Sequence, residues 1–221
     1  MNIEKAIQSQ LTSIYRILIQ HSFSIYQNHH SVKNGIITWS NYKNISFTLK
    51  NQPYSDIYNE CVKEGSYNFM LIDGALLQLM YQVDRGNLIK HRLAYYPKPN
   101  SERFIDSPQD YEDLHFGTEN FTEIQEKSSV IFPIRLDFDS DPQKLIEFEH
   151  SYVHLTLGNH TDCRIPVSKP VTPNKFISFI LMSFYMSKFK QEKLTLKDFN
   201  CSIPFDLLIS QKETSMVHIN H

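Results

Sequence analysis

The sequence predicts an α+β fold, an antiparallel sheet of about five to seven strands with helices packed on one face. Apolar and polar residues alternate with period two between Val130 and Val167, the spacing typical of strands. An Asp-Arg-Gly-Asn turn at residues 84–87 joins two apolar runs, and helical spacing of apolar residues occurs near the start of the chain and after Thr172. We expect residues 1–221 to form a single domain, because no repeat or composition break divides them.

The alternating stretch predicts three neighbouring strands with one apolar and one polar face. The apolar set is Phe132, Ile134, Leu136, Phe138, Val153, Leu155, Leu157, Cys163, Ile165 and Val167. The polar set includes Arg135, Asp137, Tyr152, His154, Thr156 and Arg164. Pairing that keeps the apolar residues together matches even positions with even, which can place His154 opposite Arg164.

Helical patterns frame this sheet. A long first helix is predicted from Ile3 past Ile25 to the polar residues at His29, and a shorter one from Pro53 to about Lys63. A further helix begins with Thr172 as N-cap and Pro173 as the first helical residue. We expect the first and the Thr172 helices to cover the apolar face of the sheet.

Other segments carry weaker signals. Short strands are expected at residues 36–40, 45–50 and 216–219, and a long acidic surface excursion at residues 101–126 with a short helix near residues 111–116. The net charge of -2 excludes a global positive field, so binding of nucleic acid would need a local patch. The three cysteines form no CxxC pair and favour a reducing cytoplasm, and no segment is apolar enough to predict membrane insertion.

The polar set suggests phosphate chemistry. Arg135 and Arg164 offer planar, permanently charged donors to a phosphodiester, and His154 can give or take a proton near neutral pH. Asp137 would orient these groups, and Tyr152 lies beside them on the predicted face. The competing interpretation is a solvated sheet face, which ordinarily contains such residues. We expect no cofactor, since no phosphate-binding glycine loop or nucleophile elbow occurs.

A metal site is not predicted. His150 and His154 would lie roughly 13 Å apart along a strand, too far to share an ion. Asp137, Asp139 and Asp141 lack the glycine and glutamate of a calcium loop. Cys163 is interpreted as a small buried residue, and Asp73, before Gly74, stays a distant candidate for a site.

Five stretches of the chain resemble a bacterial family named domain of unknown function 2290. They are LIDGALLQLMYQV (71–83), HRLAYYPKP (91–99), FPIRLDFDSD (132–141), HSYVHLTLGNHTDCRIPV (150–167) and TPNKFISFILMSFY (172–185). The resemblance implies a cytoplasmic bacterial protein and brings no assigned activity. Whether the protein is an enzyme stays open.

Two hypotheses of function follow. The first is a metal-independent, RNase-like effector of a toxin or phage-defence locus, which binds RNA or DNA through a local patch and uses Arg135, Asp137, Tyr152, His154 and Arg164. The second is a non-catalytic interaction subunit of a multi-protein bacterial defence complex, which works beside a larger protein partner and is motivated by the acidic excursion.

Overall fold

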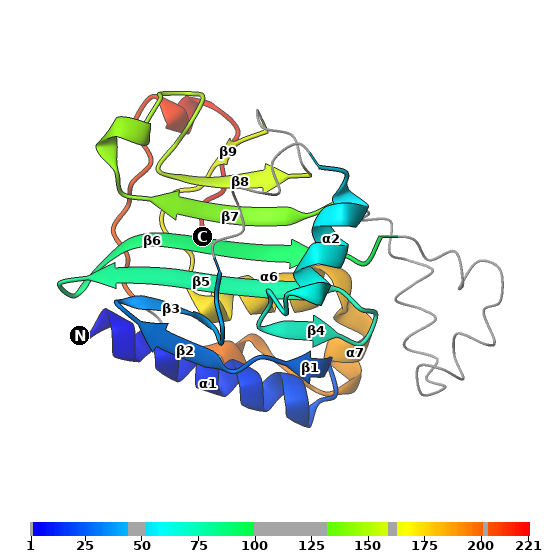
Figure 1. Ribbon diagram of the computed structural model, residues 1–221. Coiled ribbons are helices and arrows are strands. Elements are labelled where there is room, and N and C mark those ends of the chain that lie inside the picture. The colour runs from blue at the N-terminus through cyan, green and yellow to red at the C-terminus, as the bar shows by residue number, and fades with distance from the viewer. Residues whose placement is uncertain (1, 44–51, 100–131, 159–162, 201–202) are drawn as a thin grey trace.

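An antiparallel sheet forms the centre of the computed structural model, which describes residues 2–43, 52–99, 132–158, 163–200 and 203–221 (Figure 1). Within these ranges the sheet has nine strands, more than the five to seven expected. The predicted α+β class and antiparallel pairing are confirmed.

The described helices and strands follow one another in this order along the chain. The helices are α1 (Ile3–Gln20), α2 (Tyr54–Lys63), α6 (Pro173–Phe184) and α7 (Met186–Gln191), with short 3-10 helices η1 (Pro142–Lys144), η2 (Leu196–Phe199) and η3 (Glu213–Ser215). The strands are β1 (Ser24–Gln27), β2 (His30–Lys33), β3 (Ile36–Trp39), β4 (Phe69–Leu71), β5 (Leu76–Asp84), β6 (Asn87–Tyr96), β7 (Ile134–Asp139), β8 (Val153–Leu157) and β9 (Ile165–Pro166). Their order across the sheet is β1-β4-β5-β6-β7-β8-β9, with β3 also paired to β5 and β2 to β3.

The long strands β5 and β6 form the predicted hairpin. Its turn closes at the pair Asp84 and Asn87, and the two residues between them, Arg85 and Gly86, both have positive φ. Such a turn matches the right-handed twist of the strands that it joins. β7 pairs with β6, and β8 pairs with β7, so the alternating stretch of the sequence forms adjacent strands as predicted.

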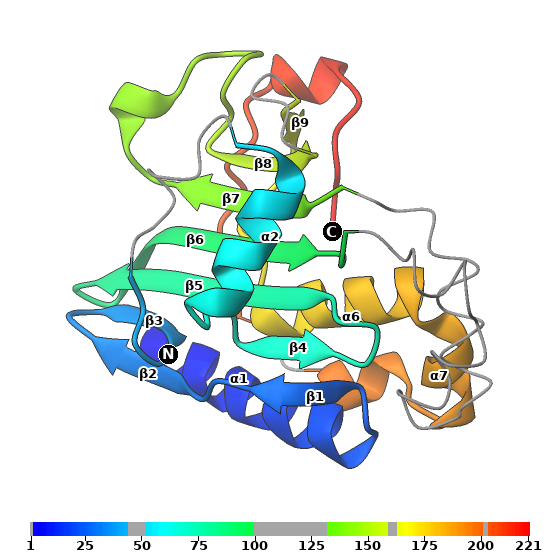
Figure 2. The same ribbon diagram turned by 45° about the vertical axis from the view of Figure 1, so that its right-hand side comes forward.

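The main core lies on the face of the sheet that α1 and α6 cover (Figure 2). Ile7, Leu11 and Ile14 of α1 are fully buried there, at the three- and four-residue spacing that marks one side of a helix. α6 begins as predicted, because Thr172 Oγ1 accepts a hydrogen bond from the Lys175 N–H and Pro173 occupies the first turn. Leu93 and Leu136 are among the strand residues that complete this core.

α2 lies on the opposite face of the sheet (Figure 1). Its buried residues Ile57, Tyr58 and Cys61 form a second, smaller core with Leu76, Ala94 and Tyr96. The prediction of helices on one face therefore holds for α1 and α6, and α2 adds partial cover to the other.

The prediction of a first helix reaching His29 is wrong. α1 ends at Gln20, and Ser22 adopts the left-handed conformation with φ 50°. The residues that follow form β1 and β2 instead, which accounts for two of the additional strands. At the other end of the chain, Ile219 makes an isolated parallel bridge to Val167 in place of the expected edge strand. Residues 45–50 and 101–126 lie outside the described residues.

His91 of β6 is a fully buried polar group in the main core. Its Nδ1–H donates to the Leu136 carbonyl at 3.2 Å, and its Nε2 accepts from the Val171 N–H at 3.1 Å. The neutral imidazole thus joins β7 to the chain just before α6. Burial lowers the pKa of His91 from 6.5 to about 3, although the nearby Asp137 charge and the Leu136 carbonyl act in the opposite direction.

His91 should make the fold sensitive to acid. Between pH 6.5 and about 3 the unfolded chain binds a proton on this ring that the folded chain does not. Stability is therefore complete above pH 6.5 and falls as the pH is lowered, by up to about 1.4 kcal/mol per pH unit. Urea unfolding across this range measures the slope, and His91→Gln should flatten it. An identical slope in both proteins would contradict this account.

Gly35, in the turn between β2 and β3, has φ +74° and approaches β5 closely. A Cβ there would overlap the Val83 carbonyl oxygen, whereas a Cβ at Gly86, with φ +83°, would meet nothing within 4 Å. Gly86→Ala should cost about 1–2 kcal/mol for the left-handed backbone alone. Gly35→Ala should cost about 3 kcal/mol or more, because β5 must also shift. Urea unfolding of both variants tests this, and equal losses would refute the close approach.

Candidate functional site

The polar side chains of β6, β7 and β8 lie on the face of the sheet that α2 partly covers. Strand pairing aligns Arg92 with Asp137 and Asp137 with His154. Arg135 lies two residues before Asp137 on β7 and therefore points to the same side. We refer to Arg92, Arg135, Asp137 and His154 as the polar cluster.

Arg92 and Asp137 form the central ion pair of the polar cluster. Arg92 Nε lies 2.8 Å from Asp137 Oδ1, and the two side chains are only 29% and 16% exposed. Burial raises the pKa of Asp137, but the charges of Arg92 and Arg135 and the hydrogen bond from Arg92 outweigh it and hold the pKa below its usual value. The Asp137 charge in turn raises the pKa of Arg92. Asp137 is thus a carboxylate that fixes a guanidinium.

Arg135 supplies a second guanidinium with a different environment. Its Nε is buried and has no hydrogen-bond partner among the described residues. It pairs across the sheet with Thr156 on one side and Ala94 on the other, neither of which brings a carboxylate. A buried N–H without an acceptor is unfavourable by roughly 1–3 kcal/mol, which an anionic ligand would relieve.

His154 is 6% exposed and has a defined tautomer. Its Nδ1 lies 3.1 Å from the Ser151 carbonyl oxygen, which can only accept, so Nδ1 carries the proton and Nε2 keeps its lone pair. The Ser151 hydroxyl donates to the buried carboxylate of Glu213, which also accepts from the Ser210 N–H at 3.0 Å. The segment around η3 therefore helps to position His154.

His150 lies much nearer to His154 than the sequence predicted. Their ring centroids are 4.8 Å apart in an edge-to-face arrangement. The prediction of about 13 Å assumed a continuous strand, but β8 begins only at Val153, and the His150 N–H closes a turn onto the Ile146 carbonyl. In the part of the chain that the structure describes, no three His, Cys, Asp or Glu side chains are grouped to hold a metal.

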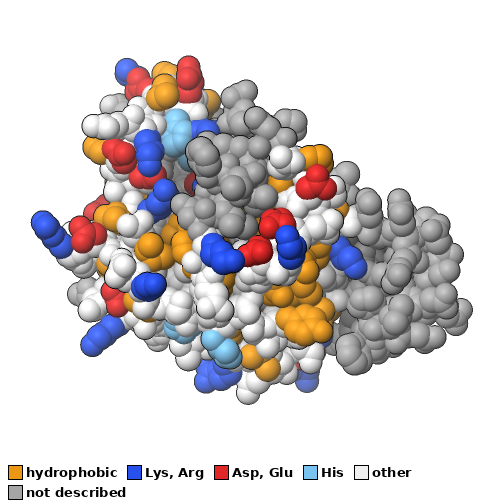
Figure 3. Space-filling model, in the orientation of Figure 1, with side chains coloured by type: hydrophobic (Ala, Val, Ile, Leu, Met, Phe, Trp, Pro, Cys, Tyr) orange, Lys and Arg blue, Asp and Glu red, His pale blue; other side chains and the backbone are white. Residues whose placement is uncertain are grey.

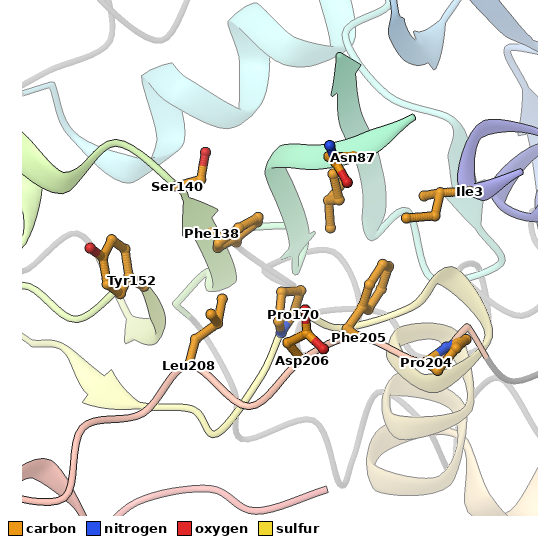
Figure 4. Close-up of a pocket in the computed structure, with 11 residues that line it drawn as sticks. Ile3, Asn87, Phe138, Ser140, Tyr152, Pro170, Pro204, Phe205, Asp206 and Leu208 are labelled. Atoms are coloured by element: carbon orange, nitrogen blue, oxygen red, sulfur yellow. The ribbon is translucent and has the colours of Figure 1, made fainter. Parts of the chain in front are cut away.

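Arg164 and Tyr152 occupy other places than the sequence predicted. His154 pairs with Pro166 rather than with Arg164, which precedes β9 and lies nearer the level of Thr156. Even positions still match even ones, so only the register was wrong. Tyr152 precedes β8 and packs against the main core, where it lines a cavity with Phe138 (Figure 4). The structure therefore does not bring Tyr152 into the polar cluster.

The sequence analysis missed Arg92. The signal was present, because the hairpin alternates inward His91 and Leu93 with outward Arg92. What the sequence could not provide is the register that aligns β6 with β7. Tyr96 of the same strand also lies near the cluster, where burial raises its pKa to about 12 although Arg135 and Arg92 lower it.

Acidic residues beside the polar cluster are already neutralised. Asp139 lies 3.3 Å from Lys90 Nζ and 2.6 Å from Lys144 Nζ. The wider face carries Lys, Arg, Asp and Glu side chains interspersed with one another, without a continuous basic surface (Figure 3). Any attraction for an anion is therefore local, as the net charge led us to expect.

Comparison with known proteins identifies a family without an assigned role. A family model described as an uncharacterized conserved protein (DUF2290) matches residues 18–221. No curated protein and no solved structure matches the chain. Among the described residues, none of the helices combines the length and apolar character needed to cross a membrane.

The Arg92–Asp137 pair should contribute measurably to stability. A double-mutant cycle with Arg92→Gln and Asp137→Asn should give a coupling of about 1–3 kcal/mol. The more exposed pair Lys212–Glu147, with side chains 70% and 40% exposed, is the matched control and should give less than about 1 kcal/mol. Because the pKa of Asp137 is lowered, its coupling should persist down to pH 3.8 and disappear below it. Equal coupling in the two pairs would contradict the description of this pair as central.

Proposed function

Since the chain belongs to this uncharacterized family, we propose from the geometry that it binds the phosphodiester backbone of RNA or DNA at the polar cluster and cleaves it without a metal. The setting that we propose is a toxin or phage-defence locus, with the protein acting in the bacterial cytoplasm. The reducing compartment inferred from the cysteines supports this setting.

One observation carries the proposal. Two guanidinium groups, Arg92 and Arg135, lie beside a single carboxylate, and Arg135 Nε is a buried donor without a partner among the described residues. Asp137 holds Arg92 in place and balances one positive charge. An anion with several oxygens, such as a phosphate, satisfies the second guanidinium in the planar geometry that arginine recognises.

His154 supplies the proton transfer. Its Nε2 lone pair can accept the proton of the ribose hydroxyl next to the bound phosphate, and that oxygen then forms a bond to phosphorus as the bond to the leaving oxygen breaks. The leaving oxygen needs a proton, and His150, whose ring lies against that of His154, is the nearest second imidazole. Arg135 would stabilise the additional negative charge that develops on the phosphate.

A second function is favoured by a different observation. Leu145, Ile146 and Phe148 lie in the turn between η1 and β8 and are 37%, 53% and 47% exposed. Exposed large apolar side chains gathered in one segment are typical of protein interfaces. We keep the alternative of a non-catalytic subunit of a defence complex, for which this segment would contact a larger partner.

Cleavage of labelled RNA and DNA in the presence of chelator distinguishes the two functions. The unmodified protein should cut, and His154→Ala should lower the rate by about 100-fold or more, the usual contribution of a general base. Arg135→Gln and Arg164→Ala should also lower it. Arg16→Ala, on the exposed side of α1, is the matched control and should cut normally.

Circular dichroism and urea unfolding would establish that each variant is folded. Absence of cleavage by the unmodified protein, or unchanged rates in folded His154→Ala, would remove the proposed active site. The exposed segment at Leu145 would then be the next subject.

A further inference from the structure

A second candidate site lies at the other face of β7. A cavity of about 390 Å³ opens where the start of β6 and the end of β7 meet the C-terminal segment (Figure 4). This volume falls within the range of about 300–1,000 Å³ typical of small-molecule sites. Phe138 lines the cavity, whereas its neighbour Asp137 belongs to the polar cluster on the opposite face.

The cavity walls are built from apolar residues of distant segments. Leu88 comes from β6, Pro170 from the connection before α6, and Phe205 and Leu208 from the C-terminal segment. The Leu208 N–H donates to the Ser168 carbonyl at 2.9 Å, which fixes this segment beside the connection. The aromatic rings of Phe138 and Phe205 are both drawn in this cavity from opposite walls (Figure 4). Such walls suit a flat apolar body.

The charges of the cavity are one-sided. Asp206 is the charged residue among those that line it, and it takes part in none of the ion pairs identified in the described part of the chain. Asn87, Ser140 and Tyr152 add neutral polar groups. An anionic ligand would meet the Asp206 carboxylate without a compensating cation, whereas an ammonium would be attracted both by Asp206 and by the faces of the aromatic rings.

We propose that this cavity binds a small molecule with an aromatic or otherwise flat apolar body and one ammonium group. The apolar body lies against Phe138, Phe205 and Leu208, and the ammonium group lies at Asp206. This site is independent of the polar cluster, because it has its own residues on the other face of the sheet. Failure of either proposal leaves the other unaffected.

The test uses a matched pair of probes, phenethylamine and phenylacetate, which share a ring and differ in charge. Backbone amide NMR spectra of the whole chain, recorded during titration, report both the position and the strength of binding. Phenethylamine should shift the amides of Asn87, Phe138 and Asp206 and bind at least about fivefold more tightly than phenylacetate. Asp206→Asn should remove this preference.

Asp56→Asn is the control, because Asp56 is an exposed carboxylate on α2, at the opposite face of the sheet. It should leave the preference for phenethylamine unchanged. Ser140→Trp, at an exposed position on the rim, should block both probes while Asp206 stays in place. Equal binding of the two probes, no binding of either, or an undiminished preference in Asp206→Asn would overturn the proposal.

Discussion

The register of β6, β7 and β8 is the constraint on which the rest of the structure depends. It aligns Arg92, Asp137 and His154 across three strands, and it turns their neighbours Leu93, Phe138 and Val153 into the main core. A slip by one residue would bury the charged set and expose the apolar one. The main core under α1 and α6 therefore stabilises the fold and, at the same time, positions the polar cluster on the other face.

Successive residues of β6 show how differently the two faces treat a basic side chain. His91 points into the main core, where burial lowers its pKa to about 3 and two backbone groups hold it neutral. Arg92 points to the other face, where the charge of Asp137 raises its pKa. A dry core accepts an imidazole because it can become neutral, whereas a guanidinium needs a partner of opposite charge. The fixed charges consequently gather on the face that only α2 covers.

The sequence predicted the parts of the fold that local patterns determine. The turn at residues 84–87, the alternation in β7 and β8, and the Thr172–Pro173 start of α6 each rest on a few neighbouring residues, and the structure confirms them. The failures concern long-range pairing. Helical periodicity carried the first helix past Gln20, because nothing local showed that Ser24–Gln27 would pair with β4. Arg164 was assigned the wrong level and Arg92 was missed for the same reason, since the number of residues between paired positions depends on turns that the sequence does not specify.

Two sets of residues on opposite faces of β7 thus offer distinct chemistry, positive and donor-rich on the α2 side and apolar with one carboxylate on the other. The central claim is that the polar cluster recognises phosphate groups. The salt dependence of binding of a labelled single-stranded RNA tests it most directly, with Arg135→Gln beside the unmodified protein. Each phosphate contact contributes about -0.7 to the slope of log affinity against log salt concentration. We predict a slope that becomes less steep by about this amount in Arg135→Gln, and an unchanged slope, or no binding at low salt, would contradict the account.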